Sequence, residues 1–227
     1  EPDEVAVAFD LKAPTFRHTM YDAYKGTRKP MPEELHEQVP LMKEVLTAMG
    51  IPIFTREGYE ADDILGTVAK KAQAAGMEVT VVSGDRDLLQ LSDAHIKISI
   101  PKTSRGTTEV HTYYPEDVKR EYQVTPEQFI DVKALMGDTS DNIPGVPSIG
   151  EKTATNLILQ FGSVNGVYEH LSEVKPPRAK KSLEEHRDLA ELSYKLAKIC
   201  IDAPVEFSPE DARIGDLYTK EAYEYMS

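Results

Sequence analysis

The sequence has no tryptophan and a single cysteine, Cys200, so it cannot form a disulfide within the chain. A lone cysteine favours a reducing compartment, and we expect a cytoplasmic location. The sequence also has no apolar run long enough to cross a bilayer and no recognisable signal peptide, so we expect no membrane partner. Apolar neighbours place Cys200 in a core rather than at a nucleophilic site, and the six histidines follow no chemical pattern.

Positive charge is in the minority, because 26 lysines and arginines face 39 acidic residues, for a net charge of −13. Taken as a sum, this charge would repel a polyanion such as DNA. However, basic residues gather at 25–29, 175–181 and 195–198, and many acids sit in short groups. Because clustered carboxylates change the local sign of charge once a divalent metal binds, the distribution leaves nucleic-acid binding open.

The order of the predicted elements is typical of an α/β fold. Strands are predicted at 5–9, 51–56, 78–85 and 96–100, and helices at 32–50 and 60–76. This alternation predicts a mostly parallel central sheet with helices on both faces. From about residue 126 the pattern becomes mainly helical. The expected helices are 126–137, 150–162 and 182–200, while 202–207 can be read as an edge strand and the remainder as a short helix.

Acidic residues fall where predicted strands end or helices begin. They form four groups, which are Asp10; Glu60, Asp62 and Asp63; Asp85 and Asp87; and Asp138 and Asp141. The carboxyl ends of parallel strands and the loops after them form one rim, along which ligands bind. Hard divalent cations take oxygen ligands, and two such ions about 4 Å apart drive in-line phosphoryl displacement. The four groups together predict a site for two Mg²⁺, with Mn²⁺ as an alternative.

Each acidic group also has a structural interpretation when it is taken alone. Aspartate is a favoured helix N-cap, where it suits the helix dipole, and it is a common turn former. The positions of the four groups relative to the predicted strands favour the metal site over four independent caps. The absence of histidine and cysteine near them disfavours zinc.

The stretch GVPSIGEKTA, residues 145–154, has the pattern of a helix–hairpin–helix motif. Its glycines let the backbone approach another surface, and the helix that follows presents free N–H groups to a phosphate. Lys152 and Thr153 are placed to add to that contact. Such a motif holds a nucleic-acid backbone without reading its sequence. The alternative is a plain helix–helix connection that uses glycine for its turn.

The stretch RHTMYDAYKGTRK, residues 17–29, mixes cationic and aromatic side chains. Such a mixture suits single-stranded nucleic acid, because bases stack on the rings while the cations follow the phosphates. A solvated helix face explains the composition equally well.

Several short motifs occur in the order found in one known family. They are FDLKAPTFRH…YKGTR, GYEADDILG, VVSGDRDLLQL, ALMGDTSDNIPGVPSIGEKTA and LILQFGS. Together they resemble the 5′-nuclease (flap endonuclease) superfamily, with its PIN-like fold, and look most like the amino-terminal 5′→3′ exonuclease domain of bacterial DNA polymerase I. The resemblance implies a metal-dependent 5′→3′ exonuclease and flap endonuclease of DNA replication and repair. Its substrates would be branched, flapped or nicked DNA and RNA primers paired to DNA, in the bacterial cytoplasm near the nucleoid.

The resemblance also implies roles for individual residues. Asp10, Glu60, Asp62 and Asp63 match acids at a first metal position, and Asp85, Asp87, Asp138 and Asp141 match those at a second. The catalytic residues would be Lys25, Asp10, Glu60, Asp62 and Asp85, with Lys25 in the arch through which a 5′ strand passes. The DNA-binding residues would be Arg17, Lys25, Arg28, Gly145, Ile149, Gly150, Lys152 and Thr153. In relatives, the hairpin also holds K⁺ through backbone carbonyls.

The expected regions follow from the same comparison. They are an α/β catalytic core at 1–125 with a basic arch region at about 17–32, a helical DNA-binding subdomain at 126–202 and a C-terminal extension at 203–227. The resemblance further implies a polymerase domain on the same chain in the full-length protein.

One departure from the family pattern keeps other functions open. Family members begin with a central strand that ends in a metal-binding aspartate, and we find no such strand ahead of Glu1. Without it, a core strand would have an exposed edge. The leading hypothesis is a two-metal nuclease, and the alternatives are a catalytically impaired, structure-specific DNA-binding fragment and an acidic cation-binding protein. The hairpin and the basic stretch argue against the last.

Overall fold

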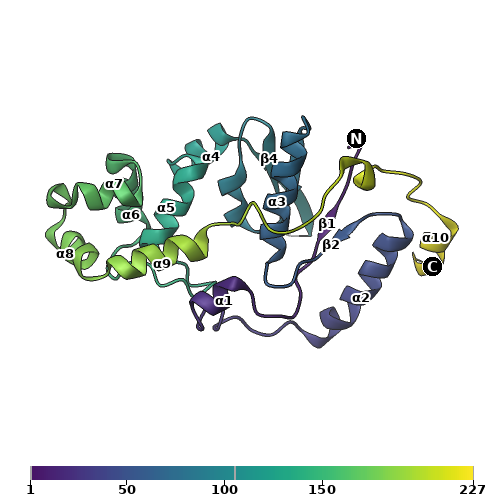
Figure 1. Cartoon of the computed structure of the whole chain (residues 1–227), viewed down its shortest axis with the longest axis horizontal. Helices are drawn as coiled ribbons and strands as arrows, with labels where there is room; N and C mark the ends of the chain where they lie inside the picture. Colours follow the sequence, from purple (N-terminus) through teal and green to yellow (C-terminus); the bar gives the residue numbers. More distant parts are fainter. Residues whose placement is uncertain (1, 105, 227) are drawn as a thin grey trace. The chain divides into compact units, whose positions relative to one another are not determined.

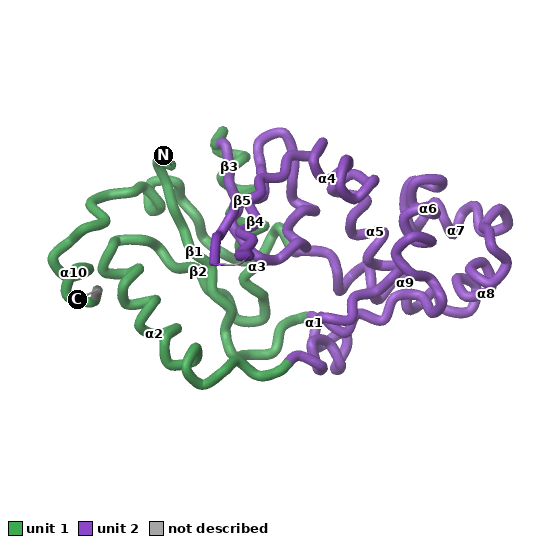
Figure 2. Tube along the Cα trace, turned by 180° about the vertical axis from the view of Figure 1, so that it is seen from behind, with its two compact units in different colours: residues 1–16, 29–77, 200–227 green, residues 17–28, 78–199 purple. Residues whose placement is uncertain are grey.

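The computed structural model describes residues 2–104 and 106–226. Figure 1 gives the order of the elements, and Figure 2 shows that the chain divides into two compact units. Unit 1 comprises residues 1–16, 29–77 and 200–227, and unit 2 comprises residues 17–28 and 78–199. Within the described residues, no helix is long and apolar enough to cross a membrane.

Unit 1 contains a short parallel ladder in which β1 (Val7–Ala8) pairs with β2 (Ile53–Phe54). The helices of this unit are α2 (Glu33–Ala48), α3 (Ala61–Ala74) and α10 (Lys220–Met226), with a 3-10 turn η3 (Pro209–Ala212). Its core places Ile64 of α3 against Ala203 and Val205 and against residues of both strands. The predicted alternation of strand and helix is confirmed here.

The edge strand considered for residues 202–207 is absent, although part of the segment is buried. Ala203 donates its backbone N–H to the Thr67 hydroxyl at 3.0 Å, and the Lys71 ammonium bonds the Val205 carbonyl. Side chains of α3 thus take the backbone groups that a neighbouring strand would otherwise use. The apolar residues of segment 202–207 are buried against helix α3 and do not belong to a strand.

Unit 2 contains a three-stranded sheet in the order β3–β4–β5. Strands β3 (Val79–Val82) and β4 (Ile96–Ser104) are parallel, as predicted, and the 3-10 helix η1 (Arg86–Leu91) lies between them in sequence. Strand β5 (Thr107–Tyr113) pairs antiparallel with β4 and was not predicted. All its residues but Tyr113 are exposed, so the alternation of apolar and polar residues that marks a strand is missing.

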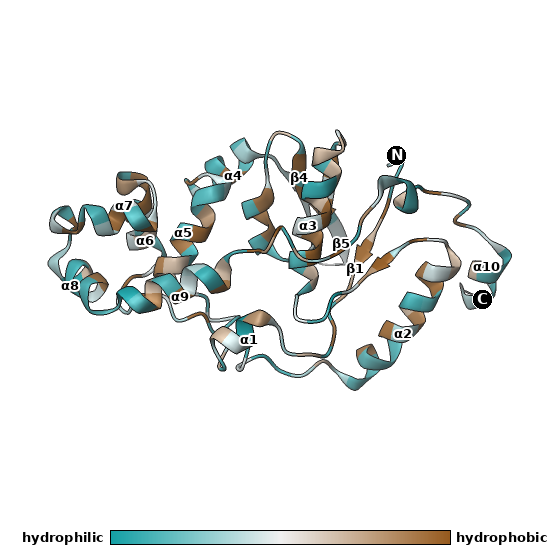
Figure 3. Ribbon diagram, viewed as in Figure 1, coloured by the Kyte–Doolittle hydropathy of each residue, from teal (hydrophilic) through white to brown (hydrophobic). Residues whose placement is uncertain are grey.

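The remaining helices of unit 2 pack together in one helical region. They are α4 (Pro115–Tyr122), α5 (Pro126–Met136), α6 (Glu151–Phe161), α7 (Val164–Glu169), α8 (Pro177–Glu185) and α9 (Arg187–Ala197), with the 3-10 turn η2 (Leu171–Glu173). The short helix α1 (Phe16–Met20) begins at the boundary between the units. Buried aliphatic residues of α5, α6, α8 and α9 form one continuous core, and hydrophobic colouring is prominent along α5 in Figure 3.

The single long helix predicted at 182–200 is wrong, because the chain forms α8 and α9 with a break at His186. His186 has φ −130° and ψ 37°, outside the helical region, and the second helix ends before Lys198. The sequence at the break contains neither glycine nor proline, so no local feature predicts it. The helices at 126–137 and 150–162 are confirmed within one or two residues.

Helix α5 buries two charged residues, Asp131 and Lys133. A buried charge is costly unless it is paired or hydrogen-bonded. Asp131 accepts the backbone N–H of Val164 at 2.8 Å and so fixes the start of α7. Lys133 lies on the part of α5 that faces the acidic residues following β3, which leads to the candidate site.

Candidate functional site

In unit 1, acidic side chains gather at the start of α3. Asp10 accepts the backbone N–H of Ala61, the first residue of the helix, at 2.7 Å. Asp63 is fully buried and accepts two backbone N–H groups, from Glu60 at 3.0 Å and from Cys200 at 2.8 Å. Asp63 therefore ties the helix start to the segment at 200. Its contacts favour a structural role over direct cation binding, whereas Asp10 is exposed and Asp62 is half-buried.

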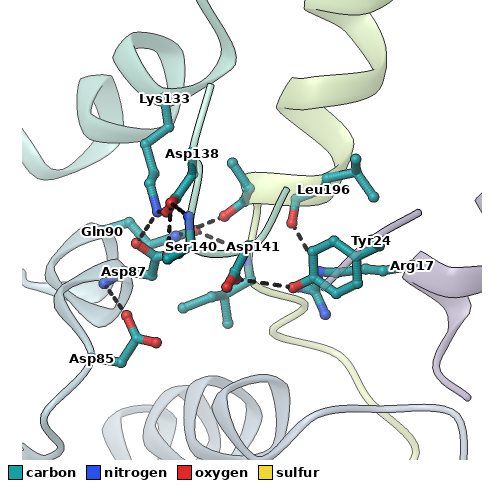
Figure 4. A network of polar contacts seen from close by, with 12 residues as sticks. Arg17, Tyr24, Asp85, Asp87, Gln90, Lys133, Asp138, Ser140, Asp141 and Leu196 are labelled. Atoms are coloured by element: carbon teal, nitrogen blue, oxygen red, sulfur yellow. Dashed lines mark hydrogen bonds and ion pairs between the residues drawn. The ribbon is translucent and has the colours of Figure 1, made fainter. Parts of the chain in front are cut away.

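In unit 2, the acidic residues that follow β3 contact the loop after α5 through one lysine (Figure 4). Asp85 caps η1 and accepts the backbone N–H of Asp87 at 2.9 Å. The Lys133 ammonium pairs with Asp87 and, at 2.6 Å, with Asp138. Asp138 also accepts the backbone N–H and the hydroxyl of Ser140, at 2.7 and 2.6 Å.

Charge in this cluster is unbalanced, because Asp87 and Asp138 share the ammonium of Lys133 while Asp85 adds a third carboxylate beside Asp87. Burial raises the pKa of Asp87 in spite of its contact with Lys133. Burial also works against ionisation of Asp138, but hydrogen bonds from Lys133 and Ser140 outweigh it and lower its pKa to about 2. Burial favours the neutral form of Lys133, but the charges and hydrogen bonds of Asp87 and Asp138 outweigh this effect and raise the pKa of Lys133. The ammonium thus stays charged, and the cluster keeps an excess of negative charge.

A cavity of about 430 Å³ opens at this cluster. Its lining includes Asp85, Asp87, Lys133 and Asp138, together with Glu151 and Thr155 of α6. The acidic side chains of this lining offer only oxygen atoms as metal ligands. Such a set fits Mg²⁺ or Mn²⁺ better than a softer metal. Within residues 2–104 and 106–226, no three acidic, histidine or cysteine side chains are already gathered as a ready-made metal site. Lys133 supplies the positive charge between Asp87 and Asp138.

The fourth acid of the second set, Asp141, pairs with Arg28, whereas Lys133 pairs with Asp87 and Asp138. The Asp141 carboxylate also accepts the Tyr24 hydroxyl at 3.3 Å. Its backbone carbonyl accepts the N–H of Lys25 at 2.8 Å. The residues predicted for the arch, Lys25 and Arg28, are therefore attached to the loop that also carries Asp138.

The structure changes the interpretation of Arg17, which was predicted to contact DNA. Its side chain is buried, with 2% of the residue exposed. The guanidinium donates to the carbonyl of Leu196 at 2.9 Å and to that of Lys198 at 2.8 Å. These bonds satisfy carbonyls at the end of α9, where a positive charge suits the helix dipole. Burial leaves no guanidinium surface for a phosphate, so Arg17 serves the fold.

The predicted hairpin forms between α5 and α6, and its two glycines differ in role. Gly145 has φ +62°, and a Cβ there would lie 2.4 Å from the backbone nitrogen of Gly137. Gly150 caps α6 with φ −93°, and a Cβ there would meet nothing within 4 Å. Gly145 is therefore needed for packing within the protein. Gly150 lies at the open end of the helix, beside the exposed Lys152 and the half-buried Thr153.

Ile149, also predicted to bind DNA, is 4% exposed and packs into the helical core. Its side chain anchors the hairpin, so a nucleic acid would meet the backbone there rather than the isoleucine. Helix α8 supports the hairpin from outside, because Ser182 bonds the Pro147 carbonyl and Arg178 donates to the Ser148 hydroxyl at 3.1 Å. The basic stretch at 175–181 thus has a contact with the hairpin that its spacing alone does not reveal.

Sequence reasoning missed Lys133 and the support from Tyr24 and Arg178. A lysine inside the apolar run FIDVKALM is a usable signal, because burial of an ammonium calls for carboxylate partners. No comparable signal marks Tyr24, whose partner Asp141 lies more than a hundred residues away in sequence.

Comparison with known proteins places these features in a family. A family model described as the 5′-3′ exonuclease N-terminal resolvase-like domain matches residues 1–123, and one described as the 5′-3′ exonuclease C-terminal SAM fold matches residues 124–220. The chain belongs to the 5′-3′ exonuclease family. The resemblance seen in the sequence is thereby confirmed, as is the α/β fold followed by a helical region with a helix–hairpin–helix.

Among its curated relatives, the DNA polymerase I of Bacillus caldotenax is 52% identical over 211 residues, which are 93% of this chain and 24% of that protein. The DNA polymerase I of Bacillus subtilis is 50% identical over 208 residues, or 92% of this chain and 23% of that protein. This 5′-3′ exonuclease chain thus spans about a quarter of the length of these relatives.

Solved structures of the same family superpose over most of the chain. T5 5′-exonuclease, solved with bound zinc ions, has a TM-score of 0.70 at 26% identity, covering 96% of this chain and 81% of its own. The T5 D15 flap endonuclease, solved as a pseudo-enzyme–product complex with DNA and metal ions, has a TM-score of 0.69 at 27% identity, covering 85% and 73%. Like these relatives, the chain is a nuclease domain.

Proposed function

We propose that this nuclease hydrolyses phosphodiester bonds at the 5′ ends of DNA and of RNA primers paired to DNA, using two divalent cations. Asp10, Glu60 and Asp62 would hold the first cation, with Asp63 positioning the helix that carries two of them. Asp85, Asp87 and Asp138 would hold the second. The observation that carries this proposal is the carboxylate cluster of unit 2, where Asp87 and Asp138 share one ammonium and Asp85 lines the same cavity. Mg²⁺ is the expected ion, and Mn²⁺ the expected substitute.

Held by these carboxylates, the cations would supply the positive charge that activates a water molecule and stabilises the leaving oxygen of an in-line displacement. The chain contributes fixed carboxylates, because Asp85 and Asp138 are held by backbone N–H groups before any substrate arrives. Lys25 adds positive charge at the scissile phosphate, where a preorganised cation acts most strongly. Arg28 and Lys25 belong to the turn that would receive the 5′ strand.

The hairpin supplies a grip on the duplex portion of the substrate. Gly150, Lys152 and Thr153 stand at the N-terminus of α6, whose free N–H groups and positive dipole end suit a phosphate. Arg178 extends this surface along α8. K⁺ is the ion we expect at the hairpin carbonyls, and flapped or nicked duplexes are the expected DNA substrates. The 126–202 region would bind DNA, and the 1–125 region would carry most of the catalytic acids.

The relatives also guide what we propose for the natural protein. Because the matching DNA polymerase I chains are about four times as long, we propose that a polymerase domain accompanies this nuclease. A DNA substrate of this kind implies work at the bacterial nucleoid, within the cytoplasm.

Substitution of Asp85 by asparagine tests the chemistry. The cleavage rate is expected to fall at least about a hundredfold, because a cation ligand is lost. DNA affinity, measured by fluorescence anisotropy, is expected to stay the same or rise, because repulsion of the phosphates decreases. If rate and affinity fell equally, Asp85 would not be a metal ligand. If the unsubstituted protein bound DNA but never cut it with Mg²⁺ or Mn²⁺, the alternative of a DNA-binding module without catalysis would replace the nuclease.

Substitution of Lys152 by alanine tests the hairpin. Affinity is expected to fall for all DNA sequences alike, and the salt dependence of binding should flatten by about one phosphate contact. Lys119→Ala, which removes an exposed lysine of α4, serves as the matched control. A loss confined to particular sequences would contradict a backbone contact.

A further inference from the structure

Two cations line the cavity beside the acidic cluster, and they differ in what they contact. Lys133 is buried, and its ammonium pairs with Asp87 and Asp138. Arg86 begins η1, is exposed and lines the same cavity. Among residues 2–104 and 106–226, the Arg86 guanidinium has neither a hydrogen bond nor an ion pair. One cation of the cavity is therefore bound within the protein, and the other is available to a ligand.

Comparison with the other arginines of unit 2 sets Arg86 apart. In the part of the unit that the structure describes, the others bond through their guanidinium groups to a carbonyl, hydroxyl or carboxylate of the chain; they are Arg17, Arg28, Arg120, Arg178 and Arg187. The guanidinium is a planar fork of five donors that matches a phosphate in a bidentate manner. The fork of Arg86 is the one in this described part that the protein leaves open.

The Arg86 side chain lies along the wall of the cavity rather than against the acids next to it in sequence. It forms no ion pair with Asp85 or Asp87, although both are carboxylates. Its charge acts instead on Tyr122, at the end of α4: burial raises the pKa of this phenol to about 12, and Arg86 opposes the shift. Tyr122 is part of the same lining. The guanidinium therefore faces the cavity from the side of α4.

The cavity joins the acidic cluster to the start of the helix that follows the hairpin. Its lining includes Asp85 and Asp138 of the cluster and also Glu151, the first residue of α6. Gly150 caps that helix, where a phosphate would approach the free amides. A strand with one phosphate at the cluster and another at α6 would therefore pass the cavity. Arg86 lies where it would meet the phosphates in between.

The charge of the surroundings gives such a cation a purpose. The chain carries a net charge of −13, and the cluster has more carboxylates than ammonium groups, so both repel an approaching phosphate. Cations held by the cluster would offset this repulsion at the scissile phosphate. The adjoining phosphate would still face acidic side chains. An exposed arginine offers it charge-assisted hydrogen bonds, which are stronger than neutral ones.

We propose that Arg86 is a substrate-binding residue, which contacts the first or second phosphate on the 3′ side of the scissile phosphate in the cleaved strand. The 3′ side is chosen because the duplex that the hairpin would hold lies on that side of a 5′ flap. The inference rests on the proposed function, in which the cluster holds a cation at the scissile phosphate. It concerns binding, so it can be tested without cleavage.

Affinity for flapped DNA tests the contact. Fluorescence anisotropy is measured with the natural protein in Ca²⁺, a hard cation that carboxylates also bind, at times when gels show the DNA intact. Arg86→Gln is expected to weaken binding about three- to tenfold and to reduce the salt dependence by about one phosphate contact. Arg86→Lys is expected to recover part of the loss, because it keeps the charge but not the fork.

The matched control is Arg120→Gln, which removes an exposed arginine of α4 outside the cavity lining. It makes the same change in net charge and is expected to bind DNA like the wild-type protein. Equal losses for Arg86→Gln and Arg120→Gln would overturn the proposal, because they would indicate a general effect of charge.

Neutral phosphates locate the contact along the strand. A methylphosphonate replaces one charged phosphate at a time, and affinity is measured for the wild-type protein and for Arg86→Gln. At the contacted phosphate the two losses are expected not to add, because each removes the same interaction. At the other positions they are expected to add. Additive losses at both the first and the second phosphate on the 3′ side would overturn the proposal.

Stability and cation affinity separate this role from one in the fold. Because Arg86 is exposed and makes no bond within the described residues, Arg86→Gln is expected to keep the urea midpoint of the wild-type protein. Its Mn²⁺ affinity, measured by electron paramagnetic resonance, is expected to stay equal or rise, since a nearby positive charge is lost. A lower urea midpoint with unchanged DNA affinity would show a structural role and overturn the proposal.

Cleavage separates the failure of this inference from the failure of the proposed function. If the wild-type protein showed the contact through Arg86 but never cut flapped DNA with Mg²⁺ or Mn²⁺, the proposed function alone would fail. If it cut the DNA while Arg86→Gln bound every substrate like the wild-type protein, the role of Arg86 alone would fail.

Discussion

At the scale of single residues, burial separates two aspartates that stand side by side in the sequence. Asp63 is fully buried and accepts two backbone N–H groups, whereas Asp62 is half-buried at the start of the same helix. Their chemistry is the same, so the difference in role comes from the direction in which the helix turns each side chain. Asp63 contributes to stability, and Asp62 is expected to contribute to cation binding.

We therefore predict opposite effects for two matched substitutions. Asp63→Asn leaves only one oxygen for two N–H donors, which should lower the free energy of unfolding by about 2–3 kcal/mol. Asp62→Asn should change it by no more than about 0.5 kcal/mol but slow cleavage at least about a hundredfold. Urea unfolding and single-turnover cleavage measure the two effects. A stable but inactive Asp63→Asn variant would contradict the assignment.

The acids of the candidate site were predictable from sequence, and their partners were not. Carboxylates after strands and at helix starts stand out because the pattern is local. Lys133, Tyr24 and Cys200 act through contacts with residues tens to more than a hundred positions away, which only the folded chain reveals. For the same reason Arg17, a surface cation by composition, proves to be a buried cap of α9.

At the scale of elements, the hairpin offers two glycines that differ only in their surroundings. Gly145→Ala places a Cβ against the backbone of Gly137 in a left-handed conformation, and we expect a loss of about 3 kcal/mol in unfolding free energy. Gly150→Ala should cost less than about 1 kcal/mol, since the site is open and the residue is a helix cap.

Stability is expected to depend more on Gly145, whereas DNA affinity is expected to depend more on Gly150. A folded Gly150→Ala protein is expected to bind DNA several-fold more weakly, because the added methyl keeps the phosphate away from the α6 amides. Chemical unfolding and fluorescence anisotropy provide the measurements. Unchanged affinity would show that the backbone near Gly150 makes no close contact with DNA.

Tyr168, on helix α7, makes the stability of the protein depend on pH in the alkaline range. Burial raises the pKa of Tyr168 to about 12, against the opposing effect of Arg187, which lies 4.9 Å from its ring. The unfolded chain loses this proton near its ordinary value of about 10. The contribution is therefore complete below about pH 10 and is lost as pH rises toward 12.

We predict that the wild-type protein loses on the order of 2 kcal/mol more stability than Tyr168→Phe between pH 10 and 12, after allowance for partial exposure of the ring. The comparison between the two proteins removes the effect of the other tyrosines. Urea unfolding midpoints of the two proteins between pH 10 and 12 measure this difference. If the stability of both proteins fell in parallel with pH, the raised pKa of Tyr168 would be refuted.

The elements that were predicted share strong local signals. Helix α5 has Thr125 and Gln128 as a capping box, Pro126 in its first turn and Gly137 at its end. Helices α3 and α6 likewise end before glycines in the left-handed region. The break between α8 and α9 and the strand β5 lack such signals, because tertiary packing and hairpin pairing decide them. Local patterns therefore located most elements but not every boundary.

At the scale of the whole molecule, the net charge of −13 sets the expected response to ions. Clusters of like charge destabilise the folded chain and are relieved by cations that bind only when the clusters are assembled. We predict that Mg²⁺ at millimolar concentration raises the melting temperature by several degrees, and that NaCl at equal ionic strength raises it less. Calorimetry with Asp138→Asn as a control measures the difference. An equal effect of the two salts would point to general screening.

The central claim is that this chain is a metal-dependent nuclease that works from the 5′ end. The most direct measurement is a time course on one flapped DNA duplex that carries different fluorophores at its 5′ and 3′ ends, incubated with the natural protein and Mg²⁺. We predict short products that carry the 5′ label from the earliest times, an intact 3′ label on the remainder and complete inhibition by a chelator. Cleavage from the 3′ end, or cleavage that persists in the chelator, would contradict the account.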